Sequence, residues 1–334
     1  MTFEQYLIDN AQEVNDFIDD YFKGEEYADL NRYLYGPLGE FSSNAGKRHR
    51  PLICLLACKA VGGDPGDALR SAVAVENFHT AALIHDDISD ESKTRRGKPC
   101  MHISEGLGIA INAGDMALAS VIATVVHDER LSDEIKLRVV HEITEMDKRT
   151  IEGQALDIGW ARDRRFDLSI DDYLLMATRK TAVYSGGAPL AIGAIIGQGT
   201  EEQIEALRDF GLQTGLAFQI QDDLLNLIGS AESTQKDFRS DITEGKRTYI
   251  VVSALQDSTV REELISILDA HTEDEGLMAR AVELMDGCGA IEASREYAQK
   301  LTEEAKTKLA GILPESDELG ILMSMADYFV DRLR

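Results

Sequence analysis

The chain contains two acidic stretches with the same spacing. The first lies in "LIHDDISDESKTRRGKP" and the second in "FQIQDDLLNLIG". Their members are Asp86, Asp87 and Asp90 in the first, and Asp222, Asp223 and Asn226 in the second. Residues four apart share one face of a helix, and like charges there are destabilising unless something neutralises them. Magnesium takes one or two carboxylates and fills its shell with substrate phosphates. One such stretch is usually a solvated helix face, but two copies at the ends of apolar helices predict a pair of magnesium sites that clamp a diphosphate.

Basic residues gather in four short groups, "AGKRHRP", "TRRGKP", "TRKTAVY" and "QKDFRSDITEGKRT". Any one of them alone is best explained as a solvated run. In an acidic chain, however, several basic groups are better explained if they converge on anionic substrates. The arginine fork suits phosphate oxygens, and lysine adds a point charge.

Composition excludes several classes of protein. The 334 residues carry a net charge of −26, from 34 basic and 60 acidic side chains. This argues against a nucleic-acid binder and against docking on anionic lipid. The four cysteines form no zinc pattern, so we expect free thiols in a reducing cytoplasm. The N-terminal segment is acidic and amphipathic, unlike a signal peptide.

Apolar residues recur at helical spacing almost everywhere. Helices are predicted over 69–87 and 204–229, and an amphipathic helix over 320–334. The uncharged run 181–200 contains five glycines and a proline. It is predicted to be a buried core helix rather than a membrane span, and no stable membrane insertion is expected. We find no alternating strand, no hairpin and no low-complexity linker. The sequence therefore predicts one all-α domain over residues 1–334.

The ordered segments "GKRHRP", "FHTAALIHDDISDESKTRRGKP", "GQALDI", "RKTAVY", "FQIQDD" and "SDITEGKRT" resemble those of the trans-isoprenyl diphosphate synthases (polyprenyl synthetases), over almost the full length. This resemblance implies the isoprenoid synthase fold, a bundle of about a dozen helices around a deep central cavity, usually as a homodimer. The implied reaction joins isopentenyl diphosphate head to tail to an allylic diphosphate (dimethylallyl, geranyl or farnesyl) and so makes the chain a prenyltransferase.

The resemblance also implies roles for individual residues. Three Mg²⁺ ions, with Mn²⁺ as an alternative, are expected at Asp86, Asp87, Asp90 and Asp222, with Asp223 and Asn226 completing the second motif. Contacts to the allylic diphosphate are expected from Arg95, Lys180 and Lys246, with Lys236 as a further candidate. The isopentenyl diphosphate pocket is expected to contain Lys47, Arg50, His79 and Arg96. Polar groups near the allylic cation are Thr181 and Gln219, and Gln154 and Asp157 lie on a polar helix facing the cavity.

Two features bear on the product. Asn226 replaces a third aspartate that many members carry, so metal affinity there is expected to be weaker. Ala81 and Ala82 lie about one turn before Asp86, where family members that stop at fifteen carbons carry large aromatic side chains, and Phe78 lies about two turns before it. Twenty carbons, as in geranylgeranyl diphosphate, is the first expectation, and twenty-five to thirty the second. A farnesyl diphosphate synthase stays open, because the two alanines could simply be helix formers packed against a neighbour.

Other activities remain open. A terpene cyclase or head-to-head synthase shares the fold and the first aspartate motif but lacks the isopentenyl pocket. A non-catalytic regulatory subunit typically loses the aspartate motifs. His79 would by default be a core histidine, and only the resemblance favours a binding role.

Overall fold

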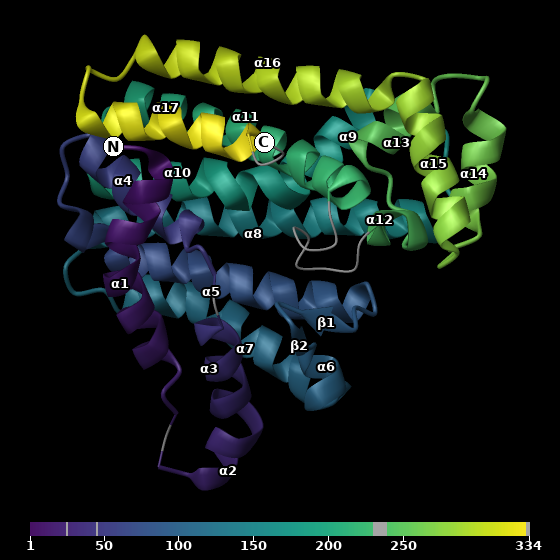
Figure 1. Cartoon of the computed structure of the whole chain (residues 1–334). Coiled ribbons are helices and arrows are strands. Elements are labelled where there is room, and N and C mark those ends of the chain that lie inside the picture. The colour runs from purple at the N-terminus through teal and green to yellow at the C-terminus, as the bar shows by residue number, and fades with distance from the viewer. Residues whose placement is uncertain (25, 45, 230–238, 332–334) are drawn as a thin grey trace. The chain divides into compact units, whose positions relative to one another are not determined.

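The protein is all-α, as the sequence predicts. The structure is a computed structural model and describes residues 1–24, 26–44, 46–229 and 239–331. Figure 1 shows these residues as helices joined by short loops, with one small hairpin. In chain order the elements are α1 (Phe3–Tyr21), α2 (Ala28–Leu30), the π-helical η1 (Asn31–Tyr35), α3 (Gly36–Ser43), α4 (His49–Ala60), α5 (Pro65–Ser89), β1 (Thr94–Arg95), β2 (Lys98–Pro99), α6 (Met101–Ser104), α7 (Leu107–Val126), α8 (Asp133–Arg162), α9 (Ile170–Ala177), the π-helical η2 (Thr178–Gly187), α10 (Ala188–Ile196), α11 (Glu201–Ile228), α12 (Ser240–Thr243), α13 (Tyr249–Ala254), α14 (Arg261–Asp269), α15 (Glu275–Gly287), α16 (Ala290–Ala310) and α17 (Asp317–Val330).

The helices fall into two compact units. The first comprises Met1–Asp147, Tyr184–Gly211 and Lys308–Met325. The second comprises Lys148–Val183, Leu212–Thr307 and Ala326–Arg334. The chain passes between the units several times, since both α8 and α11 contribute to each of them. A single domain over the whole chain stays a prediction.

Helix α5 is the centre of the first unit. It begins after Asp64, whose side chain accepts a hydrogen bond from the Gly66 N–H at 2.9 Å, and Pro65 occupies its first position. Both are favourable helix-start residues, because the cap satisfies a free N–H and proline has none to lose. The helix packs against α4, α7 and α10, and buried residues occupy most of its circumference. This confirms the helix predicted over 69–87 and fixes the place of the first aspartate cluster.

A short antiparallel hairpin joins α5 to α6, where the sequence analysis expected no strand. Thr94 pairs with Pro99 and Arg95 with Lys98. The two residues at its turn, Arg96 and Gly97, have φ of 52° and 76°. Positive φ at both positions is the requirement of a tight type I′ hairpin, whose twist matches that of the strands. Strands of two residues are too short to produce an alternating pattern, which explains why the sequence did not reveal them.

The uncharged run 181–200 is interior, as predicted. It begins in η2 and continues in α10, in which every residue from Ala188 to Ile196 is buried. One helix of the described residues, α7, is long and apolar enough to cross a membrane, but only by length and composition. Core helices of soluble proteins pass the same test, so this is weak evidence for a span.

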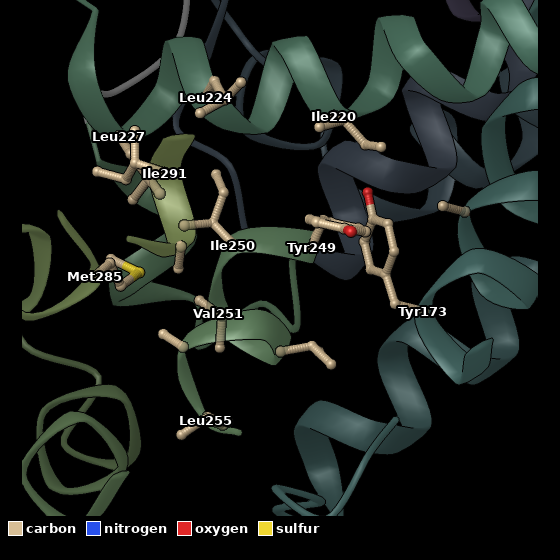
Figure 2. Close-up of a cluster of buried hydrophobic side chains, with 14 of the residues drawn as sticks. Tyr173, Ile220, Leu224, Leu227, Tyr249, Ile250, Val251, Leu255, Met285 and Ile291 are labelled. Carbon is tan, nitrogen blue, oxygen red and sulfur yellow. The ribbon is translucent and has the colours of Figure 1, made fainter. Parts of the chain in front are cut away.

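The second unit has its own hydrophobic core, shown in Figure 2. In this cluster Ile220 of α11 lies beside Tyr173 and Tyr249, and Leu227 of the same helix lies beside Ile291. Around them Tyr173 and Tyr249 meet edge to face, with ring centroids 5.6 Å apart, and Tyr249 stacks on Tyr297 at 5.1 Å. This packing anchors α11, the helix that carries the second aspartate cluster.

Candidate active site

The first aspartate cluster lies at the C-terminal end of α5. The negative end of a helix dipole makes carboxylates unfavourable there unless cations are close. Arg95 of β1 supplies one cation, because its Nε donates to Asp87 Oδ1 at 2.7 Å and its terminal nitrogen lies 2.5 Å from the same oxygen. A second carboxylate oxygen, Asp86 Oδ2, lies 3.9 Å from Arg95. Burial disfavours the arginine charge, but these carboxylates raise the pKa of Arg95 above its usual value.

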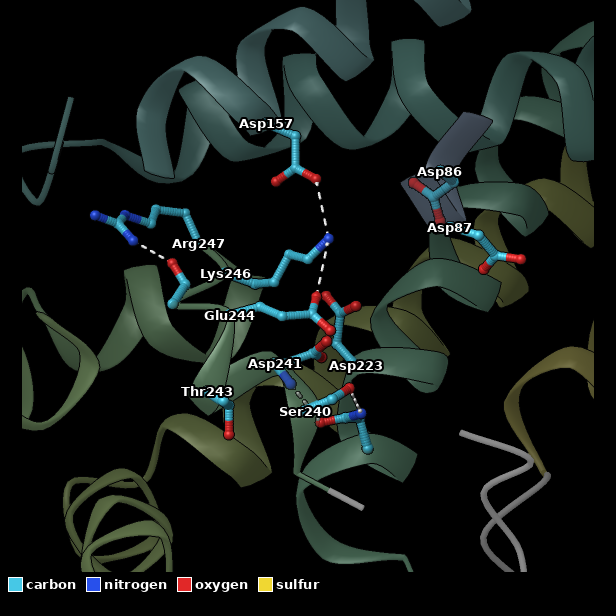
Figure 3. Close-up of polar contacts among 12 residues, drawn as sticks. Asp86, Asp87, Asp157, Asp223, Ser240, Asp241, Thr243, Glu244, Lys246 and Arg247 are labelled. Atoms are coloured by element: carbon cyan, nitrogen blue, oxygen red, sulfur yellow. Dashed lines mark hydrogen bonds and ion pairs between the residues drawn. The ribbon is translucent and has the colours of Figure 1, made fainter. Parts of the chain in front are cut away.

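The three aspartates therefore have different surroundings. Asp87 is buried, and its Oδ2 has no hydrogen-bond partner among the described residues. Asp86 and Asp90 are partly exposed and share one face of the last helical turn. Asp86 and Asp87 point to different sides of the helix (Figure 3). Carboxylate oxygens are the hard ligands that magnesium prefers, and the helix dipole favours a cation here, so the donor chemistry suits magnesium. Among the described residues, however, no group of three or more Asp, Glu, His or Cys side chains is gathered to hold a metal ion.

Arg50, near the start of α4, is a buried cation, and its hydrogen-bond partners among the described residues are all uncharged. Its Nε and one terminal nitrogen donate to Ser185 Oγ at 3.2 and 2.8 Å, and that same nitrogen donates to the Tyr184 hydroxyl at 3.2 Å. Its other terminal nitrogen lies 3.2 Å from His79 Nε2. A guanidinium only donates, so Nε2 accepts and the hydrogen of the neutral ring resides on Nδ1. Burial, and then the charge of Arg50, lower the pKa of His79 well below its usual value.

Several positive charges lie close to His79. Arg95 and Arg96 also lower the pKa of His79, so three arginines act on this one ring. His79 Nδ1 is buried and has no partner among the described residues. A neutral donor beside several cations is suited to a phosphate oxygen. The default interpretation of His79 as a satisfied core histidine therefore does not fit its surroundings.

Two other predicted residues of the isopentenyl pocket lie nearer the surface. Arg96 is half-buried and donates to the backbone oxygen of Asn44. Lys47 is exposed. A β-carbon on Gly46 would lie 3.3 Å from an Arg96 terminal nitrogen, so the glycine leaves room for that guanidinium. Arg48, from the same basic group, is structural, because it forms a buried ion pair with Glu76 at 2.7 Å.

In the second unit Asp157 of α8 holds two of the predicted lysines, Lys180 and Lys246, and Figure 3 shows its contact with Lys246. Lys180 donates to Asp157 Oδ2, and the Lys246 Nζ lies 3.7 Å from the same oxygen and 3.2 Å from Glu244. All four side chains are at least partly buried. Lys180 and Lys246 thus share one carboxylate, and their expected contact with the allylic diphosphate stays a prediction. The structure pairs Arg179 with Glu152, at 2.6 Å.

A hydrogen-bond chain links the polar groups expected near the allylic cation. Thr181 Oγ1 donates to Gln219 Oε1 at 2.7 Å, and Gln219 Nε2 donates to Asp223 Oδ1 at 2.7 Å. The Tyr173 hydroxyl donates to the other Asp223 oxygen at 2.9 Å. Burial, and then the neighbouring Asp241, raise the pKa of Asp223 well above its usual value. Asp223 therefore orients Gln219 and Thr181, whereas its neighbour Asp222 is partly exposed.

Asn226 uses both ends of its amide within the protein. Its nitrogen donates to Ser240 Oγ at 3.1 Å, and its oxygen accepts from the Asp241 backbone N–H at 3.2 Å. The Arg239 N–H also donates to the Asn226 backbone oxygen at 3.1 Å. An aspartate could not donate to Ser240 in this way. The asparagine therefore ties the segment that begins at Arg239 to the end of α11.

The remaining predicted residues are less tightly placed. Gln154 is half-buried on α8. Lys236 lies outside the described residues. Sequence reasoning overlooked Tyr173, Ser185 and Asp241 as partners of site residues. Asp241 stood within "SDITEGKRT", and Ser185 directly follows "RKTAVY", whereas Tyr173 offered no signal.

The three residues expected to set chain length differ in exposure. Phe78 is 4% exposed and meets the Tyr184 ring edge to face, with centroids 5.6 Å apart. Ala81 is 1% exposed and packs in a cluster with Ala113 and Ala117 of α7. Ala82 is half-buried. Ala81 therefore behaves as a packed helix residue, and Ala82 is the alanine with free surface.

Comparison with known proteins identifies the family of the chain. The sequence profile of the Polyprenyl synthetase family matches residues 31–285. The chain is therefore a member of the polyprenyl synthetase family, and it is a prenyltransferase.

Individual relatives are similar over nearly the whole length. A "Short chain isoprenyl diphosphate synthase" from Methanothermobacter thermautotrophicus is 40% identical over 86% of each chain. A "Geranylfarnesyl diphosphate synthase" from Natronomonas pharaonis is 34% identical over 93% of this chain and 91% of its own.

Solved structures are similar as well. A geranylgeranyl pyrophosphate synthetase from Pyrococcus horikoshii has a TM-score of 0.89 at 32% identity, covering 98% of both chains. A geranylgeranyl pyrophosphate synthase from Corynebacterium glutamicum, complexed with isoprenyl diphosphate and magnesium, has a TM-score of 0.86 at 29% identity, covering 99% of this chain and 98% of its own. These likenesses confirm the isoprenoid synthase fold expected from the sequence.

Proposed function

We propose that this prenyltransferase condenses isopentenyl diphosphate head to tail with dimethylallyl, geranyl and farnesyl diphosphates, and that its product is geranylgeranyl diphosphate. The observation that carries the proposal is the setting of Arg50. A buried cation costs free energy unless it is paired, and the described partners of Arg50 are neutral hydroxyl and imidazole groups. An anionic ligand would supply the missing charge.

The proposal requires binding residues for two diphosphate substrates. We assign Arg50, His79, Arg96 and Lys47 to the binding of isopentenyl diphosphate. We assign Arg95, Lys180 and Lys246 to the binding of the allylic diphosphate, with Lys236 as a further candidate. Asp86, Asp87, Asp90 and Asp222 hold magnesium, and Mn²⁺ is an alternative ion. When bound, three such ions neutralise the diphosphate and stabilise the charge that develops as it leaves. Thr181 and Gln219, oriented by Asp223, present their oxygens toward the allylic cation.

Product length is supported by side-chain size. Alanine at 82 cannot form the aromatic floor that stops growth at fifteen carbons, so the tail passes the first turn of α5 below Asp86. Phe78, one turn further, is the candidate floor. A twenty-five- to thirty-carbon product is the second candidate, favoured by the similarity to a geranylfarnesyl diphosphate synthase.

One assay tests the proposal. The purified chain is incubated with Mg²⁺, excess isopentenyl diphosphate and farnesyl diphosphate, and the products are resolved by chain length. We expect one dominant twenty-carbon diphosphate. A cyclised or head-to-head product would instead identify a terpene cyclase or a head-to-head synthase, and an inert chain would identify a regulatory subunit; either result refutes the proposal.

We also propose that the protein is a homodimer that meets its partner through α7. Leu107, Ile111 and Val126 are 54%, 42% and 50% exposed on this helix. Asp115 is the one charged residue between Leu107 and Val126. Two copies that each carry a net charge of −26 repel one another least where their surfaces are uncharged. A second copy therefore suits this apolar face, and covering it would also remove the reason to consider α7 a membrane span.

Sedimentation tests the homodimer. The wild-type chain should sediment as a dimer, and Ile111→Glu should shift it toward monomer. Leu277→Glu is the matched control, because Leu277 of α15 is 43% exposed and lies outside α7. A monomeric wild type, or equal effects of both substitutions, would contradict the proposal.

All four cysteines are free thiols, which supports a reducing cytoplasm as the compartment.

A further inference from the structure

We propose that Ser185, assisted by Tyr184, is a positioning residue for isopentenyl diphosphate, because it fixes the orientation of Arg50 without neutralising its charge. This inference rests on the proposed function. Ser185 is separated from Arg50 by 135 residues and is 2% exposed. Its hydroxyl oxygen accepts from Nε at 3.2 Å and from a terminal nitrogen at 2.8 Å. One serine oxygen therefore holds a whole edge of the guanidinium plane.

Four of the five N–H groups of Arg50 have acceptors within the protein, which leaves one N–H for a ligand. Ser185 takes two of them, Tyr184 takes a third and His79 takes a fourth. The fifth, on the nitrogen that contacts His79, has no acceptor among the described residues. It is the donor left for a ligand oxygen. Because arginine is rigid and planar, fixing one edge also fixes the direction of this fifth N–H.

An uncharged acceptor is essential to the arrangement. A carboxylate at position 185 would form a buried ion pair with Arg50, and its negative charge would compete with a diphosphate. A hydroxyl holds the guanidinium in place and leaves its full positive charge for the ligand. The Tyr184 ring adds a neutral support, since the Arg50 Cζ lies 4.7 Å from its centroid.

Close backbone packing makes the support rigid. A β-carbon on Gly193 of α10 would lie 2.0 Å from the Cys54 carbonyl oxygen of α4, so these two helices touch backbone to backbone. A β-carbon on Gly186 would lie 2.1 Å from the Gly211 carbonyl oxygen, so the end of η2 is similarly pressed onto α11. The elements that carry Arg50 and Ser185 therefore have little freedom to shift.

The test is the separate measurement of both Michaelis constants. For Ser185→Ala we expect KM for isopentenyl diphosphate to rise about 10- to 100-fold, because hydrogen bonds to a charged group are lost. We expect kcat at saturation and KM for farnesyl diphosphate to change less than about threefold. Tyr184→Phe, which keeps the ring, should raise the same KM only a few-fold. Ser294→Ala is the matched control, because this buried serine donates within α16 to the Ala290 oxygen and should change neither constant.

A double-mutant cycle separates positioning from a merely structural role. In an Arg50→Lys background the two-point contact cannot form, so Ser185→Ala should add less than about twofold to KM. The full effect of Ser185→Ala in that background, or an unchanged KM in the wild-type background, would overturn the inference. Failure of the proposed function is distinguishable, because the wild-type chain itself would then not elongate farnesyl diphosphate.

Discussion

Arg95→Ala should destabilise the protein far more than Arg96→Ala, although the two arginines are neighbours in one hairpin. Arg95 is bound to Asp87, whose side chain is 2% exposed. The described residues offer Asp87 no other side-chain partner, and its second oxygen already has none. Removing the arginine leaves an uncompensated buried carboxylate. Breaking a buried ion pair in this way lowers the free energy of unfolding by about 3–5 kcal/mol.

Arg96 differs in each respect. It donates to a backbone oxygen, and burial, opposed by Glu76, lowers its pKa rather than raising it. Loss of the Arg96 side chain should lower the free energy of unfolding by less than about 1 kcal/mol, the usual net value of one hydrogen bond. We expect its effect instead on KM for isopentenyl diphosphate. Arg95→Ala should act chiefly on the allylic substrate or its ionisation.

Thermal unfolding gives the assay. One kcal/mol shifts Tm by roughly 2–4 °C in a domain of 150–250 residues, so Arg95→Ala should lower Tm by on the order of 10 °C. The double variant Asp87→Ala/Arg95→Ala should recover part of this loss, because no charge then remains buried. If Arg95→Ala melted within about 2 °C of the wild type, the buried-pair argument would be wrong.

Three further predictions concern metal, product and pH. Chelation of divalent cations should abolish turnover, and Asp86→Ala or Asp222→Ala should lower the rate by orders of magnitude; full activity in excess chelator would exclude the metal clamp. Ala82→Phe should shorten the main product to fifteen carbons while condensation continues, and Phe78→Ala should lengthen it, as measured by product chromatography; an unchanged product would refute this description of the cavity floor. Burial raises the pKa of Asp147 from 3.8 to about 7, so its ionisation destabilises the fold as pH rises from about 4 through 7. Asp147→Asn should therefore raise Tm at pH 8 and leave it nearly unchanged at pH 4. The gain in the free energy of unfolding at pH 8 has an upper bound of about 4 kcal/mol. An equal gain in Tm at both pH values would contradict the titration.

The sequence by itself determined the elements and the spacing of the chemistry. A helical period, a proline start and an aspartate cap are local properties, so α5 and its run of carboxylates were predictable. Residues four apart share a face in any helix, and their spacing alone therefore put Asp86 and Asp90 together. The resemblance to prenyl synthases also rests on ordered local motifs. Strands of two residues lie below what periodicity reveals, and the hairpin of Arg95 and Arg96 was therefore missed.

Only the tertiary structure decided which of these side chains work in pairs. Burial decides that Asp87 turns inward to Arg95 and that Asp223 orients Gln219. It also decides that Ala81 is packed while Ala82 has free surface. The spacing of residues in the sequence does not encode burial. Ser185 meets Arg50 across 135 residues of chain. Such contacts are set by how α4 and α10 pack together, and that packing depends on glycines whose significance appears only once the backbones are in place.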